Sequence, residues 1–199
     1  FGASFEKITQ VVGARNNEIM FGLNMIVFKG KTIFVADTSV HEYPSSEEMS
    51  EIAISAARVV RLFGIDPKVA FVSHSTFGQP LTSRTKHIKK AVDILKDKNV
   101  DFEFDGDMQP DVALNDEYKD LYPFSNIVGN ANILIMPGQH SAAISYKMLK
   151  TLGDTKVIGP LLIGLGLPIE IAPLRTSTSE LINLASIAAY SADKIDYKK

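Results

Sequence analysis

The most constraining feature of the sequence is a short apolar run, Ile133 to Met136, which stops at Pro137-Gly138 and leads into a helical pattern ending in Tyr146-Lys147. An apolar run of this length bounded by turn residues is typical of a buried strand in a parallel sheet. Small and polar residues at such a strand-to-helix junction usually line a ligand crevice at the carboxyl ends of the strands. We therefore expect the segment from Gly129 to Lys147 to form one wall of a binding site.

Predicted strands and helices alternate through most of the chain, which indicates an α/β fold with a mostly parallel sheet covered by helices on both faces. The expected strands are 20–28, 32–36, 69–72, 100–104, 133–136 and 169–171, with 158–163 as a mixed apolar segment. The expected helices are 4–13, 45–63, 83–96, 111–121, 141–152 and 176–192. The last helix is expected to bury a stripe of Leu181, Leu184, Ala185 and Ala188, and 193–199 to form a solvated tail.

Composition narrows the classes of partner. The chain has 199 residues, 22% of them charged, and a net charge of -2, which favours neither nucleic acid nor an anionic membrane as a partner. It has no cysteine, which excludes disulfides and thiolate metal sites and fits a cytoplasmic protein. Its longest apolar stretch, 157–171, is interrupted by glycine and proline and is not a transmembrane helix. Because it starts at Phe1 within a helical pattern, we expect it to be a piece of a longer polypeptide.

Two segments at predicted strand ends carry polar side chains suited to a ligand. Ser73 to Gly78 follows the strand at 69–72, and its hydroxyls and amides suit either a phosphate cradle or an ordinary helix cap. Within it, His74 is either a general base or a solvated loop residue. Asp105 to Asp111 places three carboxylates close together, which suits either a metal ion or the cap of the next helix; the spacing is not that of a calcium loop.

Three further segments allow the same two kinds of interpretation. The amides of Gly129 to Asn132 either bind a ligand or tie down their loop. Lys147, in the helix after His140, either neutralises a phosphate or stays solvated. Arg175 precedes the last helix, where a cation opposes the helix dipole, so we expect an anion near it.

Together these segments resemble the phosphate acetyltransferase/butyryltransferase family, and more closely the phosphotransacetylase-like domain fused to bacterial NADP-dependent malic enzymes. The resemblance covers about 34–189. The residues that carry it are Phe34–Thr38, Glu51–Ala53, Val69–Gly78, Asp105–Asn115, Tyr122–Ser125, Asn130–Asn132, Tyr146-Lys147 and Gly159-Pro160. Three of these stretches look closer to the malic-enzyme domain than to free-standing transacetylases: Ser75–Gly78, the Asp105 block with Leu114-Asn115, and Pro123–Ser125.

The resemblance implies a two-lobed architecture like that of isocitrate and isopropylmalate dehydrogenases, usually dimeric through its second lobe. On that basis, 1–68 would belong to the first lobe with the crossing helices, and 69–199 would form the second. Active members bind coenzyme A in the cleft between the lobes, and its thiol attacks acetyl phosphate. The acyl-CoA or phosphate ligands implied here are Ser73, Ser75, Thr76, Gln109, Asn130, Asn132, Tyr146, Lys147 and Arg175.

The sequence departs from the active family pattern near Arg175. Active members read Leu-Ser-Arg-Gly there, with an aspartate six residues after the arginine. In this alignment Leu174 replaces the serine, Thr176 the glycine and Leu181 the aspartate. Glu180 is adjacent, but one helical position is a rotation of about 100°, so it is a poor substitute.

A second departure lies before Tyr146-Lys147, where Ala143 replaces the family's usual asparagine. Loss of these groups while Arg175 and Lys147 remain indicates binding without turnover. The resemblance therefore implies a regulatory and oligomerising domain with acetyl-CoA as effector, no catalytic residue and no metal of its own. NADP, the divalent metal and malate decarboxylation would belong to an absent N-terminal part.

Two alternatives stay open. One is an active phosphate acetyltransferase, in which Arg175, Ser75 and Thr76 would be catalytic. The other is a purely structural dimerisation module. The expected partners are acetyl-CoA or a related acyl-CoA and further copies of the same chain.

Overall fold

The computed structural model describes residues 1–195 of the chain. A six-stranded sheet runs through it in the order β4-β3-β5-β2-β1-β6. The strands are β1 (Phe21–Phe28), β2 (Lys31–Ala36), β3 (Lys68–Val72), β4 (Glu103–Met108), β5 (Ile133–Ile135) and β6 (Lys156–Ile163). All run in one direction except β1, which is antiparallel to both of its neighbours. The predicted α/β fold with a mostly parallel sheet is confirmed.

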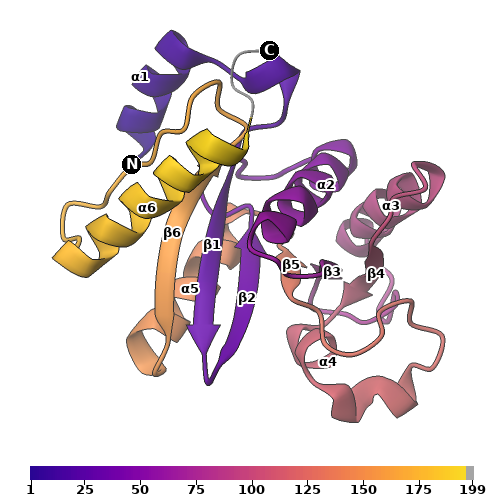
Figure 1. Cartoon of the computed structure of the whole chain (residues 1–199). Coiled ribbons are helices and arrows are strands. Elements are labelled where there is room, and N and C mark those ends of the chain that lie inside the picture. Colours follow the sequence, from indigo (N-terminus) through magenta and orange to yellow (C-terminus); the bar gives the residue numbers. More distant parts are fainter. Residues whose placement is uncertain (196–199) are drawn as a thin grey trace.

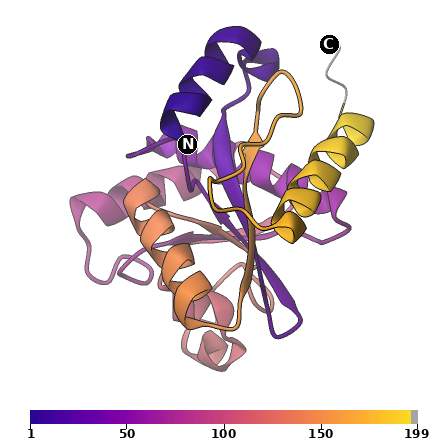
Figure 2. The ribbon, with the colours of Figure 1, turned by 90° about the vertical axis from the view of Figure 1, so that its left-hand side faces the viewer.

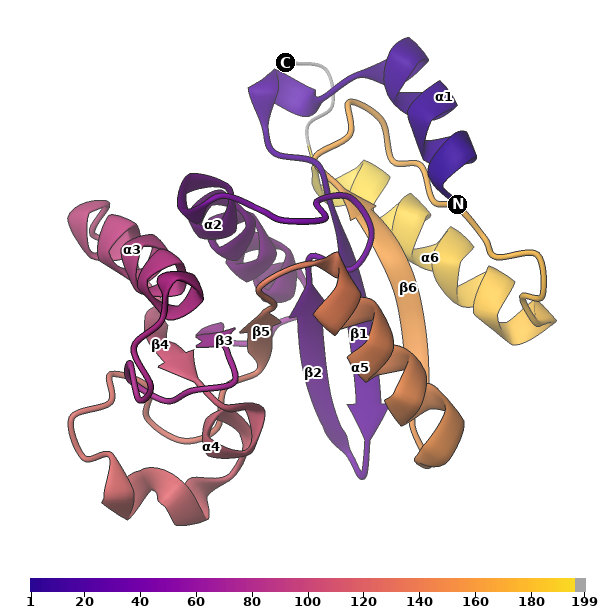
Figure 3. The same cartoon turned by 180° about the vertical axis from the view of Figure 1, so that it is seen from behind.

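Helices cover both faces of the sheet. The helices are α1 (Gly2–Val12), α2 (Ser46–Leu62), α3 (Ser83–Asp97), α4 (Pro110–Leu114), α5 (Gln139–Leu152) and α6 (Thr178–Lys194). In Figure 1 α2 and α6 lie in front of the sheet and α5 behind it, and Figure 3 shows α5 from its own side. Figure 2 shows the strands edge-on between α5 and α6. The result is a three-layered domain.

Each face of the sheet has its own apolar core because side chains alternate along a strand. One core joins the sheet to α2, α3 and α6 through residues such as Phe71, Ile52 and Leu184. The other packs α4 and α5 against the opposite face, with Leu134, Ala113 and Ala142. α5 buries little: Ala142 is its one fully buried residue.

The first helices and strands match their predictions closely. Gly30 turns the β1–β2 hairpin with a φ of 76°, a left-handed conformation that suits glycine. Ser45 and Glu48 form the predicted capping box at the start of α2. The predicted lobe boundary falls between residues 68 and 69, inside β3, and strands from both sides of it share the one sheet. The assignment to lobes stays a prediction.

Two predicted strands were placed wrongly. The strand expected at 100–104 begins at Glu103 and continues to Met108, because Gly106 has no side chain and lets the strand approach Phe71 closely. The strand expected at 169–171 is absent from the described chain. There, the side chain of Glu170 accepts a hydrogen bond from the backbone N–H of Leu162 on the edge strand β6.

Two predicted helices also differ. The helix expected at 111–121 is broken at Asn115, which is extended, into α4 and a 3₁₀ turn, η2 (Asp116–Leu121). On α6 the inward stripe is rotated from the prediction: Leu184 is buried, but Leu181 and Ala185 are exposed. α6 packs beside the edge strand β6, so one narrow stripe is enough to cover it. Asp193 and Lys194 of the predicted tail are helical, and 196–199 lie outside the described residues.

Candidate functional site

The candidate site lies at the carboxyl edge of the sheet, where the loops after the parallel strands meet. Ser73 follows β3, Gln109 follows β4, Asp37 follows β2 and Pro137-Gly138 follows β5. In open α/β sheets this edge is where ligands generally bind. Hydroxyl and carboxylate side chains that follow the strands in sequence therefore lie at this end of the sheet.

A buried carboxylate organises the loop after β3. Asp107 is 2% exposed and Ser75 is fully buried, and the Ser75 hydroxyl donates a hydrogen bond to the Asp107 carboxylate. The other carboxylate oxygen accepts the backbone N–H of Gly78 at 3.0 Å. Asp107 is thus satisfied by hydrogen-bond donors of the neighbouring loop, which fixes the conformation of 73–78.

Two further hydrogen bonds join the β3 and β4 loops. The backbone N–H of Gln109 donates to the Thr76 hydroxyl at 3.2 Å. The backbone N–H of Ser73 donates to the carbonyl of Met108 at 2.9 Å. The structure therefore brings four predicted ligand residues together: Ser73, Ser75, Thr76 and Gln109. His74, in the same loop, is exposed.

Beside these loops lies an open depression of about 530 Å³, which we call the aromatic–lysine depression. Phe77 and Phe124 stand in its wall with ring centroids 4.8 Å apart. Lys89 and Lys96 of α3 line it, and its floor includes Asp107. Two aromatic rings beside two cations suit a ligand that carries both a flat ring and anionic groups.

Two of the three carboxylates in the Asp105 block, Asp105 and Asp107, are engaged in hydrogen bonds within the protein. Asp105 accepts the backbone N–H groups of Gly106 and Asn126 at 2.9 and 2.7 Å. Asp111 lies in the first turn of α4, as the capping interpretation expects, whereas Asp105 and Asp107 lie in β4. Within residues 1–195 no group of three or more His, Asp or Glu side chains is placed to hold a metal ion.

A second buried carboxylate, Asp37, organises the loop after β2. It accepts backbone N–H groups from Gly22, Ser39, Val40 and His41, at distances from 2.7 to 3.3 Å. The His41 ring also contacts it at 2.8 Å, and this hydrogen bond to Asp37 raises the pKa of His41 despite partial burial. Sequence reasoning assigned Asp37 no role, although an aspartate directly after a buried strand was a usable signal.

Asn130 and Asn132 lie at the opposite end of the parallel strands, just before the start of β5. Asn132 precedes β5, where its side chain accepts the Lys68 backbone N–H at 2.8 Å and donates to the Asp66 carbonyl at 2.7 Å. β3 separates this edge from Ser73 by five residues, about 16 Å of extended chain at ~3.3 Å per residue. The expectation that the whole segment from Gly129 lines one crevice is therefore wrong: Asn132 ties down its loop.

The backbone at Glu42 packs against the junction after β5. The backbone N–H of Gln139 donates to the Glu42 carbonyl at 3.2 Å. A Cβ at Gly138 would lie 2.6 Å from that carbonyl oxygen, so only glycine fits. Further along α5, Tyr146 is half-buried, and burial raises its pKa. Lys147 is exposed, with its ammonium 5.9 Å from the centre of the Tyr146 ring.

Arg175 is exposed and lies beside the start of α6, in a small hollow that also includes Lys150 and Glu180. Glu180 forms a capping box with Ser177 and an ion pair with Lys150 at 2.8 Å. The Lys150 contact, with the hydrogen bonds from Ser177, lowers the pKa of Glu180 to about 2. Glu180 thus supplies the negative charge that the helix N-terminus favours.

Comparison with known proteins gives three consistent results. The family profile of phosphate acetyl/butaryl transferase matches residues 3–189. An NADP-dependent malic enzyme of Rhizobium meliloti is 43% identical over 96% of this chain, which corresponds to 25% of that enzyme. A phosphate acetyltransferase of Clostridium acetobutylicum is 34% identical over 81% of this chain and 49% of its own length.

Comparison with solved structures leads to the same family. A phosphotransacetylase from Streptococcus pyogenes superimposes with a TM-score of 0.89 at 28% identity, covering 96% of this chain and 60% of that protein. The chain thus spans about a quarter of the malic enzymes it matches and roughly half of the free-standing transferases.

The role of Asp107 can be tested by truncation. Asp107→Ala leaves the buried Ser75 hydroxyl and the Gly78 N–H without an acceptor, and we expect a loss of about 3 kcal/mol in unfolding free energy. Urea denaturation measures it. The control, Asp111→Ala, removes an exposed carboxylate in the first turn of α4 and should cost less than ~1 kcal/mol. Equal effects of the two substitutions would contradict the assignment.

Proposed function

This chain belongs to the phosphate acetyl/butaryl transferase family, and on that premise we propose that it is a non-catalytic domain that binds acetyl-CoA or a related acyl-CoA. We further propose that it regulates and oligomerises an NADP-dependent malic enzyme of the cytoplasm. Malate decarboxylation, NADP and the divalent metal would then belong to parts of the longer protein outside this chain.

The observation that carries the proposal is the pattern of relatives. The malic enzyme of Rhizobium meliloti is 43% identical over nearly the whole chain, and that of Rickettsia prowazekii is 37% identical over 96% of it. The chain spans only about a quarter of each of these enzymes. A segment that makes up about a quarter of the enzyme fits an attached regulatory module better than the part that carries out the malic reaction.

The aromatic–lysine depression supports a coenzyme A ligand. Coenzyme A combines an adenine ring with phosphate groups. Phe77 and Phe124 offer faces for the ring, and Lys89 and Lys96 offer cations for the phosphates. Asp107 connects the 73–78 loop to this depression. Its carboxylate accepts a hydrogen bond from the Ser75 hydroxyl, and Asp107 also lines the depression.

Three side chains support binding without turnover. Attack by the coenzyme A thiol needs a base with a pKa nearer to neutrality, and Glu180, with a pKa of about 2, is a weak one. Leu181 occupies the position of the family's aspartate, and its side chain is 47% exposed with no acid-base chemistry. Leu174, in place of the serine, is also exposed.

The alternative is an active phosphate acetyltransferase, favoured by the 34% identity to the Clostridium enzyme of that name. In that case Ser75, Thr76 and Arg175 would act in catalysis. Formation of acetyl phosphate from acetyl-CoA and phosphate separates the two functions. A rate that disappears in Arg175→Ala would favour the transferase.

Regulation by a bound acyl-CoA requires two sites whose affinities are coupled. The effector must bind one arrangement of the assembly more tightly than another, and the coupling is reciprocal. An oligomeric domain supplies such arrangements because subunits can shift against each other. The proposed effector site and the proposed oligomer contact therefore belong to one mechanism.

α5 carries an apolar stripe suited to the oligomer contact. Ile144, Met148 and Leu152 repeat every four residues and are 58%, 54% and 80% exposed. Residues four apart lie on the same side of a helix, so the three form one continuous apolar strip. We propose that the same strip on a second copy covers it, as an isologous contact.

Binding is tested by calorimetric titration of the 199-residue chain with acetyl-CoA. We expect saturable binding without formation of acetyl phosphate. Lys89→Glu and Lys96→Glu should each weaken binding at least fivefold, the equivalent of about 1 kcal/mol. Lys31→Glu, the same charge change in the distant hairpin, should leave it unchanged. No heat of binding at millimolar ligand would contradict the proposal.

The oligomer contact is tested by the molar mass in solution, measured by light scattering. Met148→Glu places a charge in the middle of the strip and should convert a dimer into a monomer, because an unpaired buried charge is costly. Val11→Glu is the matched control: Val11 is 86% exposed, on α1. A dimer that survives Met148→Glu, or that is lost only in Val11→Glu, would exclude the strip as the interface.

A further inference from the structure

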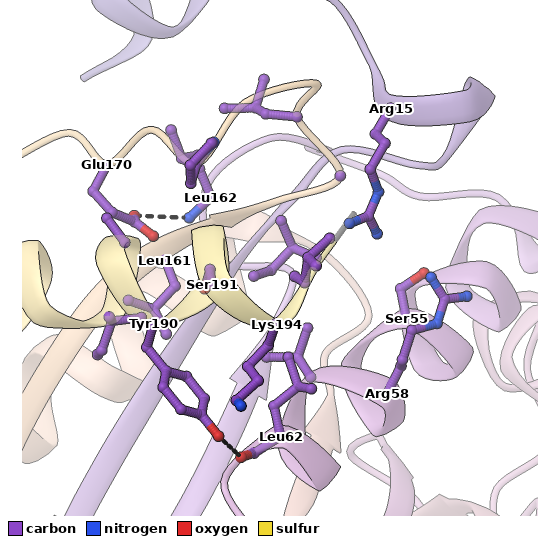
Figure 4. A pocket seen from close by; sticks show the side chains of 18 of the residues that line it. Arg15, Ser55, Arg58, Leu62, Leu161, Leu162, Glu170, Tyr190, Ser191 and Lys194 are labelled. Atoms are coloured by element: carbon purple, nitrogen blue, oxygen red, sulfur yellow. Dashed lines mark hydrogen bonds between the residues drawn. The ribbon is translucent and has the colours of Figure 1, made fainter. Parts of the chain in front are cut away.

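A cavity of about 200 Å³ lies between α2, β6 and α6, away from the residues proposed to bind acyl-CoA. Figure 4 shows it from close by, with Glu170 and Leu162 on one side and Arg15 and Arg58 on the other. None of the nine predicted acyl-CoA or phosphate ligands lines it. The cavity is therefore separate from the proposed acyl-CoA site.

The size and walls of the cavity suit a small organic molecule. A cavity of about 150 Å³ lined by apolar side chains is enough to bind benzene. Here much of the wall is apolar, formed by Val59, Leu62, Leu161, Ile187 and Ala188. The space therefore accommodates a ring or a branched chain with one or two substituents.

Glu170 supplies a polar group at one side. Its carboxyl accepts the backbone N–H of Leu162 at 3.0 Å, and no ion pair joins it to another residue within 1–195. Burial raises the pKa of Glu170 to about 8, although the hydrogen bond from Leu162 opposes the shift. At neutral pH Glu170 is therefore a carboxylic acid whose O–H is a hydrogen-bond donor.

Charged side chains line the opposite side. Arg58 on α2 pairs with Glu18 at 2.8 Å, and Lys194 on α6 pairs with its neighbour Asp193 at 3.3 Å; both cations also line the cavity. Arg15 pairs with the same Glu18 at 2.6 Å. Arg58 and Lys194 carry several N–H donors, and each pairs with a single carboxylate, so both keep donors for an anionic ligand. With Glu170 neutral, this part of the lining favours an anion over an ammonium ligand.

The remaining titratable group in the lining is already engaged. Tyr190 donates its hydroxyl to the Leu62 carbonyl at 2.9 Å, which connects α6 to the end of α2. The titratable and charged groups that line the cavity with Glu170 are Tyr190 and Lys194 on α6, Arg58 on α2, and Arg15 and Glu18 before β1. In the described lining, Glu170 is the one carboxyl without a cation beside it.

We propose that this cavity is a second ligand site, which takes a small monocarboxylate with an apolar body and a neutral oxygen at its far end. The carboxylate lies toward Arg58 and Lys194. The apolar body contacts Leu161, Ile187 and Ala188. The neutral oxygen accepts a hydrogen bond from Glu170, whose second oxygen keeps the Leu162 N–H.

The test uses 4-acetylbenzoate, which has a carboxylate, a ring and a ketone oxygen and does not titrate between pH 7 and 9. Binding to the 199-residue chain is measured by calorimetry or by ligand-detected NMR. Because Glu170 ionises with a pKa near 8, we expect about tenfold weaker binding at pH 9 than at pH 7. Glu170→Gln keeps a donor and an acceptor at this position, so it should bind the probe with no such pH dependence.

Two controls locate the probe. 4-Methylacetophenone lacks the carboxylate and should bind at least fivefold more weakly. Ala188→Phe fills the cavity and should abolish binding of 4-acetylbenzoate while leaving acetyl-CoA binding unchanged. If Ala188→Phe does not fold, the Glu170→Gln comparison decides alone. No saturable binding at pH 7, or a pH dependence that persists in Glu170→Gln, would overturn the proposal.

Discussion

The carboxyl edge of this sheet depends on buried carboxylates that are satisfied mainly by backbone N–H and hydroxyl donors. Asp107 and Asp37 are each about 2% exposed, and donors from the adjoining loops satisfy both. A buried carboxylate left unpaired would be costly, so each loop is held in the one conformation that presents its N–H groups. This fixes the hydroxyls of 73–78 and closes the loop after β2. Any ligand at this edge meets a preorganised surface.

Much of the fold follows from local patterns, and much of the site does not. The capping box at Ser45, the turn at Gly30 and the apolar run at 133–136 each predict their element because the cause is local in sequence. The role of Asn132 could not be predicted in this way, since an asparagine before a strand looks the same whether it binds a ligand or ties a loop. Its place at the amino edge depends on β3 and β5 being parallel neighbours, a long-range fact. Glu170 was missed because its partner is a backbone N–H of an edge strand.

The side chains at these sites fit the proposed binding role better than catalysis. The depression next to Asp107 offers rings and cations, whereas the acid nearest the family's catalytic position, Glu180, is committed to Ser177 and Lys150. Glu170 lies in a separate cavity on the other side of α2 from α3, for which we propose a different and smaller ligand. The two proposed sites thus differ in the chemistry of their linings. The exposed strip on α5 lies on the opposite face from both helices α2 and α6, which leaves it accessible to another copy (Figure 3).

Amide hydrogen exchange of the 199-residue chain, with and without saturating acetyl-CoA, shows directly whether the ligand binds beside 73–78. Exchange reports which backbone N–H groups a ligand protects. If acetyl-CoA binds in the aromatic–lysine depression, exchange slows at 73–78 and 105–110 and in the part of α3 that carries Lys89 and Lys96, with no change at 129–132. Protection confined to 129–132 or to the cavity segments 161–165 and 187–195, or no protection anywhere, would contradict binding there.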